Sequence, residues 1–195
     1  MTIKIITDPL EIIRSRPSAI IKDLTCQGFH DLIIEAIKKS IDPATNNNPK
    51  KCSLLLDKDN ILLFQDNGNG LNIVESNLER TIYMLTTMLA GDPPKDSQTY
   101  SSLNFLFNLS PILIATSVYF SITTVSKDNQ YYMSCINGRI ENALHKVDKN
   151  IERGTIIRIL PDSKIWGECK INTCLIKNKI SDFINQNSYG VVLVS

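Results

Sequence analysis

The sequence predicts an α/β fold, a two-layer sandwich in which helices cover one face of a mixed, mostly antiparallel sheet. Three observations support this prediction. Short apolar runs bounded by polar turns recur along the chain and are typical of strands, and stretches with helical spacing of apolar residues lie between them. Hydrophobic residues make up 43% of the 195 residues, which is enough for one sizeable core.

Helices are expected where apolar residues recur at every third or fourth position. Residues 29–41 show this spacing, and Asp42-Pro43 ends the run. Residues 75–90 show it again up to Gly91, and a third helix is expected over residues 171–184. Residues 103–115 are ambiguous by pattern, although Pro111 suits the first turn of a helix.

Strands are expected in an early hairpin and in a later group. The runs 52–56 and 61–64 predict a hairpin with a polar turn. Asn137-Gly138 is typical of a tight turn between two of the later strands. The proline-containing segment 92–98 predicts a mobile loop. The later strands are expected over residues 118–125, 131–136, 140–144, 155–160 and 190–194.

The N-terminus and the charge restrict where the protein works. Residues 1–22 contain Arg14-Ser15-Arg16-Pro17, whose proline predicts an extended arm ahead of a single domain over residues 23–195. The N-terminus lacks the order of a signal peptide, and no apolar run reaches the ~18 residues of a spanning helix. We therefore expect a cytoplasmic protein without a membrane partner. The formal net charge is only +1, so we do not expect the protein to recognise nucleic acid directly.

The five cysteines are expected to be reduced thiols rather than metal ligands. They form no Cys-x-x-Cys pair, and with only two histidines they match no zinc spacing. An odd number of cysteines in a cytoplasmic chain indicates thiols that pack as small apolar residues.

Three short segments carry the side chains that suggest a functional site. Glu35 lies in the middle of the expected helix 29–41, on an otherwise apolar stretch. The segment Asp66-Asn67-Gly68-Asn69-Gly70 directly follows a strand, and Gly154-Thr155 opens a late strand. Each also has an ordinary interpretation. These are a solvated helix face for Glu35, a hairpin turn for the glycine-containing segment and a buried strand residue for Thr155.

The order and spacing of these segments resemble the ATP-binding domain of the DNA gyrase B subunit and of topoisomerase IV, in the GHKL ATPase superfamily. The resemblance implies the Bergerat-type ATP-binding fold, with ATP or ADP as the ligand. Further motifs carry the same resemblance over residues 14–195. They are Arg14-Ser15-Arg16-Pro17, Gly28-Phe29-His30-Asp31-Leu32, Ile41-Asp42-Pro43-Ala44, Gly154-Thr155-Ile156-Ile157-Arg158 and Leu160-Pro161-Asp162.

The resemblance also implies roles for individual residues. Glu35 takes the place of the general base that activates water toward the γ-phosphate. Asp66 takes the place of the carboxylate that accepts a hydrogen bond from the adenine amino group, and Gly68 and Gly70 let the backbone approach the base. Thr155 completes the adenine pocket through its hydroxyl and a water molecule.

Two departures affect the phosphate end of this implied site. The family's helix reads Glu-x-x-Asp-Asn, with the asparagine on Mg²⁺, whereas Lys38 and Lys39 stand here. An ammonium has no lone pair for a metal, so Mg²⁺ binding is not expected. The family's glycine-rich lid is replaced by residues 102–107, where bulky Phe105 and Phe107 cannot form a phosphate cradle. The transducer domain of the family is expected to be absent.

Two functions follow from this pattern. The departures favour a degenerate, non-hydrolysing domain that binds adenine nucleotide weakly and serves as an interaction module. Both lysines can pair with Glu35 and make it a poor base. The alternative is an active or slow Mg-ATPase, with Glu35 as the base and Lys39 neutralising phosphate directly. A topoisomerase subunit, or a second copy joined through the N-terminal arm, is the expected protein partner. A gene fragment under no constraint is a third interpretation.

Overall fold

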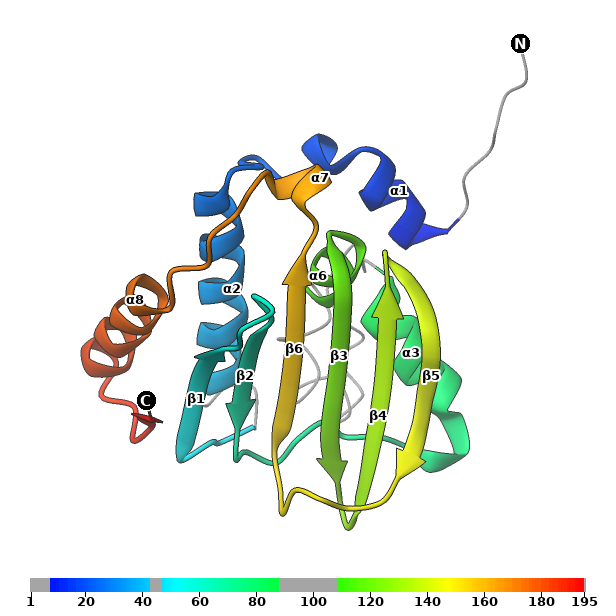
Figure 1. The fold of residues 1–195 in the computed structure, drawn as a ribbon. Helices are drawn as coiled ribbons and strands as arrows, with labels where there is room; N and C mark the ends of the chain where they lie inside the picture. The colour runs from blue at the N-terminus through cyan, green and yellow to red at the C-terminus, as the bar shows by residue number, and fades with distance from the viewer. Residues whose placement is uncertain (1–7, 43–46, 88–108, 195) are drawn as a thin grey trace.

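The structure is a computed structural model that describes residues 8–42, 47–87 and 109–194 (Figure 1). Its centre is a seven-stranded sheet with the order β5-β4-β3-β6-β2-β1-β7. Neighbouring strands are antiparallel, except that β1 and β7 are parallel. The strands are β1 (Lys51–Leu56), β2 (Leu62–Asp66), β3 (Ser117–Ser126), β4 (Asn129–Ile136), β5 (Arg139–Val147), β6 (Thr155–Pro161) and β7 (Val192–Val194).

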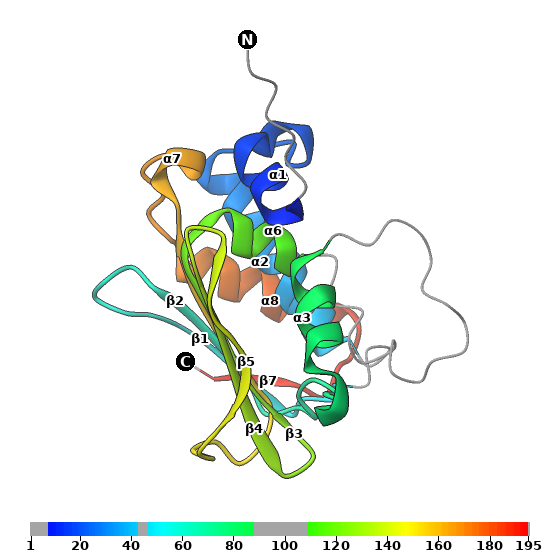
Figure 2. The same ribbon diagram turned by 90° about the vertical axis from the view of Figure 1, so that its right-hand side faces the viewer.

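The main helices lie together on one side of this sheet (Figure 2). The core fills the space between the two layers, where Phe120 and Ile122 of β3 and Ile114 of the helix layer are fully buried. Burial of such apolar side chains is the main force that holds the layers together. The arrangement confirms the predicted two-layer α/β sandwich. The covering helices are α2 (Cys26–Ile41), α3 (Leu78–Thr86), α6 (Ser110–Ala115) and α8 (Thr173–Gln186).

Helix α2 carries several of the candidate residues. It begins at Cys26 rather than at Phe29, because the side chain of Thr25 caps it by accepting a hydrogen bond from the Gly28 N–H. It ends at Ile41, as predicted, and the backbone N–H of Asp42 closes the last turn. One face of the helix is apolar and buried against the sheet and α8, so the residues on the opposite face reach solvent.

All the strands expected from the apolar pattern are present, with small differences at their ends. Asn137 and Gly138 have φ values of +51° and +73°, which confirms the tight turn between β4 and β5. The expected helix over residues 75–90 begins with the 3₁₀ helix η3 (Glu75–Asn77) ahead of α3. The short helix α7 (Ser163–Trp166), which the side chain of Asp162 caps, was not expected.

The N-terminal segment is helical, so the prediction of an extended arm was wrong. Asp8 caps α1 (Pro9–Ser15), and proline at the first position of the helix suits it because that N–H would have no helical partner. The short 3₁₀ helix η1 (Pro17–Ala19) follows. Proline does act as expected at Arg16, where the backbone leaves the helical region.

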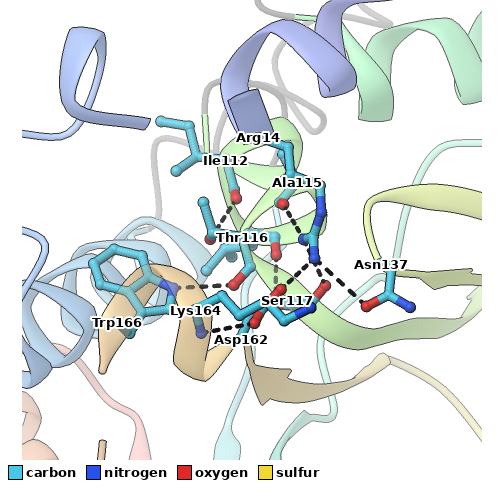
Figure 3. Close-up of polar contacts among 10 residues, drawn as sticks. Arg14, Ile112, Ala115, Thr116, Ser117, Asn137, Asp162, Lys164 and Trp166 are labelled. Carbon is cyan, nitrogen blue, oxygen red and sulfur yellow. Dashed lines mark hydrogen bonds and ion pairs between the residues drawn. The ribbon is translucent and has the colours of Figure 1, made fainter. Parts of the chain in front are cut away.

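Arg14 fixes α1 to one end of the sheet (Figure 3). Its guanidinium donates a hydrogen bond of 2.7 Å to the Ala115 carbonyl oxygen and forms an ion pair with Asp162. Beside it, the Trp166 indole N–H donates to the Thr116 carbonyl oxygen at 3.0 Å. These contacts join α1, α6, β6 and α7 at the same end of the molecule.

A disulfide joins Cys26 and Cys169, so the prediction of reduced thiols was wrong for this pair. The two residues lie 143 positions apart in the sequence. Packing of α2 against the C-terminal part of the chain brings them together, and local spacing cannot reveal such a contact. Cys52 and Cys135 are buried free thiols whose pKa burial raises to about 12, and Cys174 is exposed.

Some predictions concern residues outside the described ranges. They are the mobile loop at 92–98, Gly91 as the end of a helix, and the lid segment 102–107 with Phe105 and Phe107. Within the described ranges, no helix is both long and apolar enough to cross a membrane.

Candidate functional site

A cluster of polar side chains and glycines lies where β2 ends and β6 begins. Asp66, the last residue of β2, pairs in the sheet with Thr155, the first residue of β6. The end of α2 and the segment that precedes β1 approach the same point through their hydrogen bonds. We call this group the Asp66 cluster. Its members are Ser40, Asn47, Asp66, Gly68, Gly70, Thr124 and Thr155.

The Asp66 carboxylate is only 1% exposed and receives hydrogen bonds from this chain. One oxygen accepts the Gly68 N–H at 2.7 Å, and the other accepts the Ser40 hydroxyl at 3.4 Å. Burial raises the pKa of Asp66 to about 6, because removal from water disfavours the charged form. Hydrogen bonds from Gly68, Asn47, Ser40 and Thr155 oppose this rise.

Asn47 is central to the cluster, although it stands in the sequence Asn46-Asn47-Asn48-Pro49, whose composition is typical of a loop. Its amide nitrogen donates to the Ser40 carbonyl oxygen at 3.1 Å, and its amide oxygen accepts the Gly70 N–H at 3.2 Å. Its backbone oxygen accepts the Asn69 N–H at 2.7 Å. The side chain is 1% exposed. A run of three asparagines gives no signal that one of them is buried, so sequence reasoning missed it.

The two candidate glycines meet close neighbours from this chain. Gly70 has φ +72°, and a Cβ there would lie 2.0 Å from the Val125 carbonyl oxygen. A Cβ on Gly68 would lie 2.2 Å from the Asn47 amide oxygen. Both positions therefore need glycine for the packing of the cluster itself.

Thr155 joins the cluster through the neighbouring strand. Its hydroxyl lies 3.1 Å from the hydroxyl of Thr124 on β3, and both residues are buried. The Thr124 hydroxyl also accepts the Leu71 N–H at 2.9 Å. The chain just after Gly70 is thereby fixed to the sheet, beside Asp66.

Glu35 lies apart from this cluster. Its side chain is 54% exposed, and its carboxylate pairs with the Lys38 ammonium at 3.1 Å. The same ammonium lies 5.3 Å from the ring centroid of Phe183 on α8. Glu35 therefore faces solvent on the side of α2 next to α8. Lys39 is half-buried and immediately precedes Ser40, so it lies nearer to the Asp66 cluster along the helix.

The helix segment from Glu35 to Lys39 does not fit a magnesium ion. Magnesium binds through oxygen atoms, and Glu35 is the acid among these five residues. Lys38 and Lys39 repel a cation and offer no lone pair.

A small apolar cavity lies between α2 and the sheet. Its volume is about 20 Å³, which is space for one water molecule and not for a purine ring. Phe64, two positions before Asp66 on β2, is part of its wall. This cavity, as it stands, therefore does not hold an adenine.

No family model matches the chain. Among curated proteins, it is 30% identical over 187 residues to the DNA gyrase B subunit of Spiroplasma citri and 26% identical over 186 residues to the DNA topoisomerase 4 B subunit of Mycoplasma capricolum. These matches cover 93% and 94% of the chain, but the chain spans only 29% of either relative.

The fold has a close counterpart among solved structures. It superposes on the 43K ATPase domain of Thermus thermophilus gyrase B, solved in complex with an aminocoumarin, with a TM-score of 0.68 and 20% sequence identity. The match covers 88% of this chain and 44% of that one. The chain therefore has the fold of the gyrase B ATPase domain. Over most of its length the chain is similar in sequence to part of the B subunits of DNA gyrase and topoisomerase IV, as the resemblance indicated.

Proposed function

We propose that the chain is a degenerate gyrase-B-like domain that binds adenine nucleotide weakly, does not hydrolyse it and acts as an interaction module. The observation that carries the proposal is the 3.1 Å ion pair between Glu35 and Lys38. A general base needs a carboxylate that can reach the water it activates. Here the corresponding carboxylate pairs with a lysine and faces solvent.

The metal end of the site supports the same proposal. Lys39 stands where the resemblance places the asparagine that holds Mg²⁺. Without a bridging metal, the charge that develops on the phosphates during hydrolysis is poorly stabilised. The five helix residues from Glu35 to Lys39 do not replace that metal.

The adenine end fits its ligand better. With a pKa of about 6, Asp66 is mostly ionised at pH 7 and can accept a hydrogen bond from an adenine amino group, in competition with the groups of this chain that already donate to it. Asn47 bonds to Ser40 and Gly70, so a nucleotide would have to break these bonds to enter. Binding that breaks internal hydrogen bonds is weak, because their loss offsets part of the gain.

An active or slow Mg-ATPase is the second candidate. Glu35, Asp66 and Thr155 stand at the positions that the resemblance assigns to the base and the adenine pocket, and this favours it. In this function Lys39 contacts the phosphates directly, and the ion pair between Glu35 and Lys38 opens when ATP binds.

Calorimetric titration tests the ligand. ATP and ADP are titrated separately, each with Mg²⁺ and with EDTA. We expect similar, weak affinities in all four titrations. Asp66→Asn should weaken binding by roughly 1.5–3 kcal/mol, the range for loss of a hydrogen bond to a charged acceptor. The exposed Asp182 on α8 provides the matched control, Asp182→Asn, which should bind as the wild type does.

Steady-state phosphate release separates the two candidates. We expect no release above background. Release that requires Mg²⁺ and disappears in Glu35→Gln would contradict the proposal and establish the slow ATPase. Unchanged affinity in Asp66→Asn would place the nucleotide outside the Asp66 cluster.

The protein partner is tested without nucleotide. Because the relatives are B subunits of gyrase and topoisomerase IV, we expect the chain to associate with such a protein. Analytical ultracentrifugation of the chain alone, and mixed with a gyrase B protein, reports self-association and complex formation. Unchanged sedimentation in the mixture would exclude this partner.

A further inference from the structure

Three potential metal ligands meet at the start of α2, away from the Asp66 cluster. Cys26 lies in the first turn of the helix, and His30 follows it by one turn on the same face. Cys169 comes from the connection between α7 and α8. The donor atoms of all three residues lie within 4.8 Å of one another. Two cysteines and a histidine form a common ligand set of zinc.

His30 points into this group and is not fully satisfied by its surroundings. The residue is 5% exposed, and its Nε2 lies 3.7 Å from the Cys26 sulfur. Nε2 accepts the Asn172 N–H at 3.1 Å, whereas Nδ1 is buried without a hydrogen-bond partner in the described parts of the chain. Because Nε2 accepts a hydrogen bond, the proton of the neutral ring lies on Nδ1, and Nε2 has the lone pair that a metal ion needs.

When the disulfide is reduced, the distances between the ligand atoms suit tetrahedral coordination of a zinc ion. Zinc lies about 2.3 Å from sulfur and about 2.0–2.1 Å from nitrogen, so the two ligand atoms of such a site are roughly 3.6 Å apart. The observed distance from the Cys26 sulfur to Nε2 is 3.7 Å. Helix α2 fixes both of these ligands. Cys169 lies outside any helix or strand, so its sulfur can move to make room for the ion.

We propose that, when the disulfide is reduced, Cys26, His30 and Cys169 bind one Zn²⁺ ion, with water as the fourth ligand. A dithiol supplies two electrons and two protons to the disulfide and is itself oxidised to a disulfide, which leaves two thiols on the chain. Zinc then displaces the two thiol protons to solvent. The His30 Nε2 lone pair leaves the Asn172 N–H and binds the metal. Disulfide and metal exclude each other, and either one connects α2 to the segment before α8.

Zinc titration of the reduced protein tests this proposal. The full chain is reduced with a phosphine, desalted without oxygen and titrated with Zn²⁺ against a chromophoric chelator. We expect one Zn²⁺ per chain. Cobalt(II) in its place should give tetrahedral d–d bands and a thiolate charge-transfer band. Hydrogen peroxide, which converts the two thiols to the disulfide and two waters, should release the metal.

Variants assign the ligands. Cys169→Ser and His30→Gln should each lower zinc affinity more than tenfold, whereas Cys174→Ser, which removes an exposed thiol on α8, should leave one site per chain. Circular dichroism checks that each variant is folded. If a variant fails to fold, the comparison of oxidised with reduced wild type still decides the question. Absence of zinc binding by the reduced wild type, or the same binding after oxidation, would overturn the proposal.

Discussion

The Asp66 cluster and the Glu35 face of α2 correspond to the two ends of one nucleotide site in the resemblance, yet they differ in almost every physical respect. Asp66 is 1% exposed and bonded on both oxygens by its own chain. The Glu35 side chain is 54% exposed and pairs with one lysine. The buried end depends on close packing, whereas the exposed end depends on a pair that water and salt screen.

In the proposed function, this difference explains why the residues at the phosphate end no longer support hydrolysis, whereas those at the adenine end are retained. Residues of the cluster remain because they also hold the sheet together: Asp66 and Thr155 connect β2 to β6, and Gly70 passes close to β3. Glu35, Lys38 and Lys39 have less packing to maintain, so substitutions there cost the fold little. The phosphate end can therefore change while the fold persists.

The largest effect is expected from Gly70→Ala. A Cβ at this position would meet the Val125 carbonyl oxygen at 2.0 Å, and φ is +72°. We expect the free energy of unfolding to fall by at least about 3 kcal/mol, since both strain and a backbone clash are introduced. Urea unfolding followed by circular dichroism measures the change.

Two other glycines serve as controls for Gly70. Gly167 has φ +65° but no atom within 4 Å of a Cβ, so Gly167→Ala should cost about 1 kcal/mol from backbone strain alone. Gly190 also has open space, and its Gly190→Ala variant should be nearly neutral. Equal losses at Gly70 and Gly167 would show that the cluster is not closely packed.

The next effect concerns the pH dependence of stability. The pKa of Asp66 rises from an ordinary value of 3.8 to about 6 in the folded protein. Between these values the folded state binds the proton more tightly, so the contribution of Asp66 to the free energy of unfolding increases as the pH falls from 7 toward 4. The full change is on the order of 3 kcal/mol. Asp66→Asn should remove it.

Urea unfolding at pH 7 and at pH 5 measures this effect. The difference in unfolding free energy between the two pH values should be smaller in Asp66→Asn than in the wild type. Asp182→Asn, on the exposed surface of α8, should behave as the wild type does. The same pH dependence in Asp66→Asn and the wild type would mean that Asp66 is not the group that titrates.

Much of the fold could be predicted because its elements follow local patterns. Short apolar runs bounded by polar turns located the strands, and helical spacing located α2 and α8. The caps were harder to find. Thr25 extends α2 to Cys26, and Asp8 begins α1 in a segment where the proline pointed to an extended chain. A side-chain cap can outweigh such a weak local signal.

The site could be predicted only in part, because its remaining members meet through tertiary packing. The resemblance singled out Asp66, Gly70 and Thr155, and the structure brings these residues together. Asn47 lies in a segment without periodicity, so nothing marked it as buried. Cys26 and Cys169 form a contact across 143 positions, which a single sequence without an alignment does not reveal.

A moderate effect is expected from restoring the pair that the family carries. Lys38→Asp combined with Lys39→Asn removes two ammonium groups and adds oxygen ligands beside Glu35. We expect ATP to bind about tenfold more tightly with Mg²⁺ than with EDTA, a difference of about 1.4 kcal/mol. Calorimetry measures it, and Lys179→Asp combined with Lys177→Asn on α8 controls for the same change in charge. Identical binding with Mg²⁺ and with EDTA would show that this helix does not lie beside the phosphates.

The smallest effect is expected from Glu35→Gln in the free protein. The ion pair between Glu35 and Lys38 is a partly solvated pair three residues apart on one helix, a type that contributes about 0.3–0.5 kcal/mol. Urea unfolding of Glu35→Gln, Lys38→Met and the double variant gives the coupling between them, which we expect to be below about 0.5 kcal/mol and to fall further at high salt. A coupling above about 1.5 kcal/mol would mean that Glu35 is held in a dry environment, as a catalytic carboxylate would be. The contrast between the exposed face of α2 and the Asp66 cluster would then no longer hold.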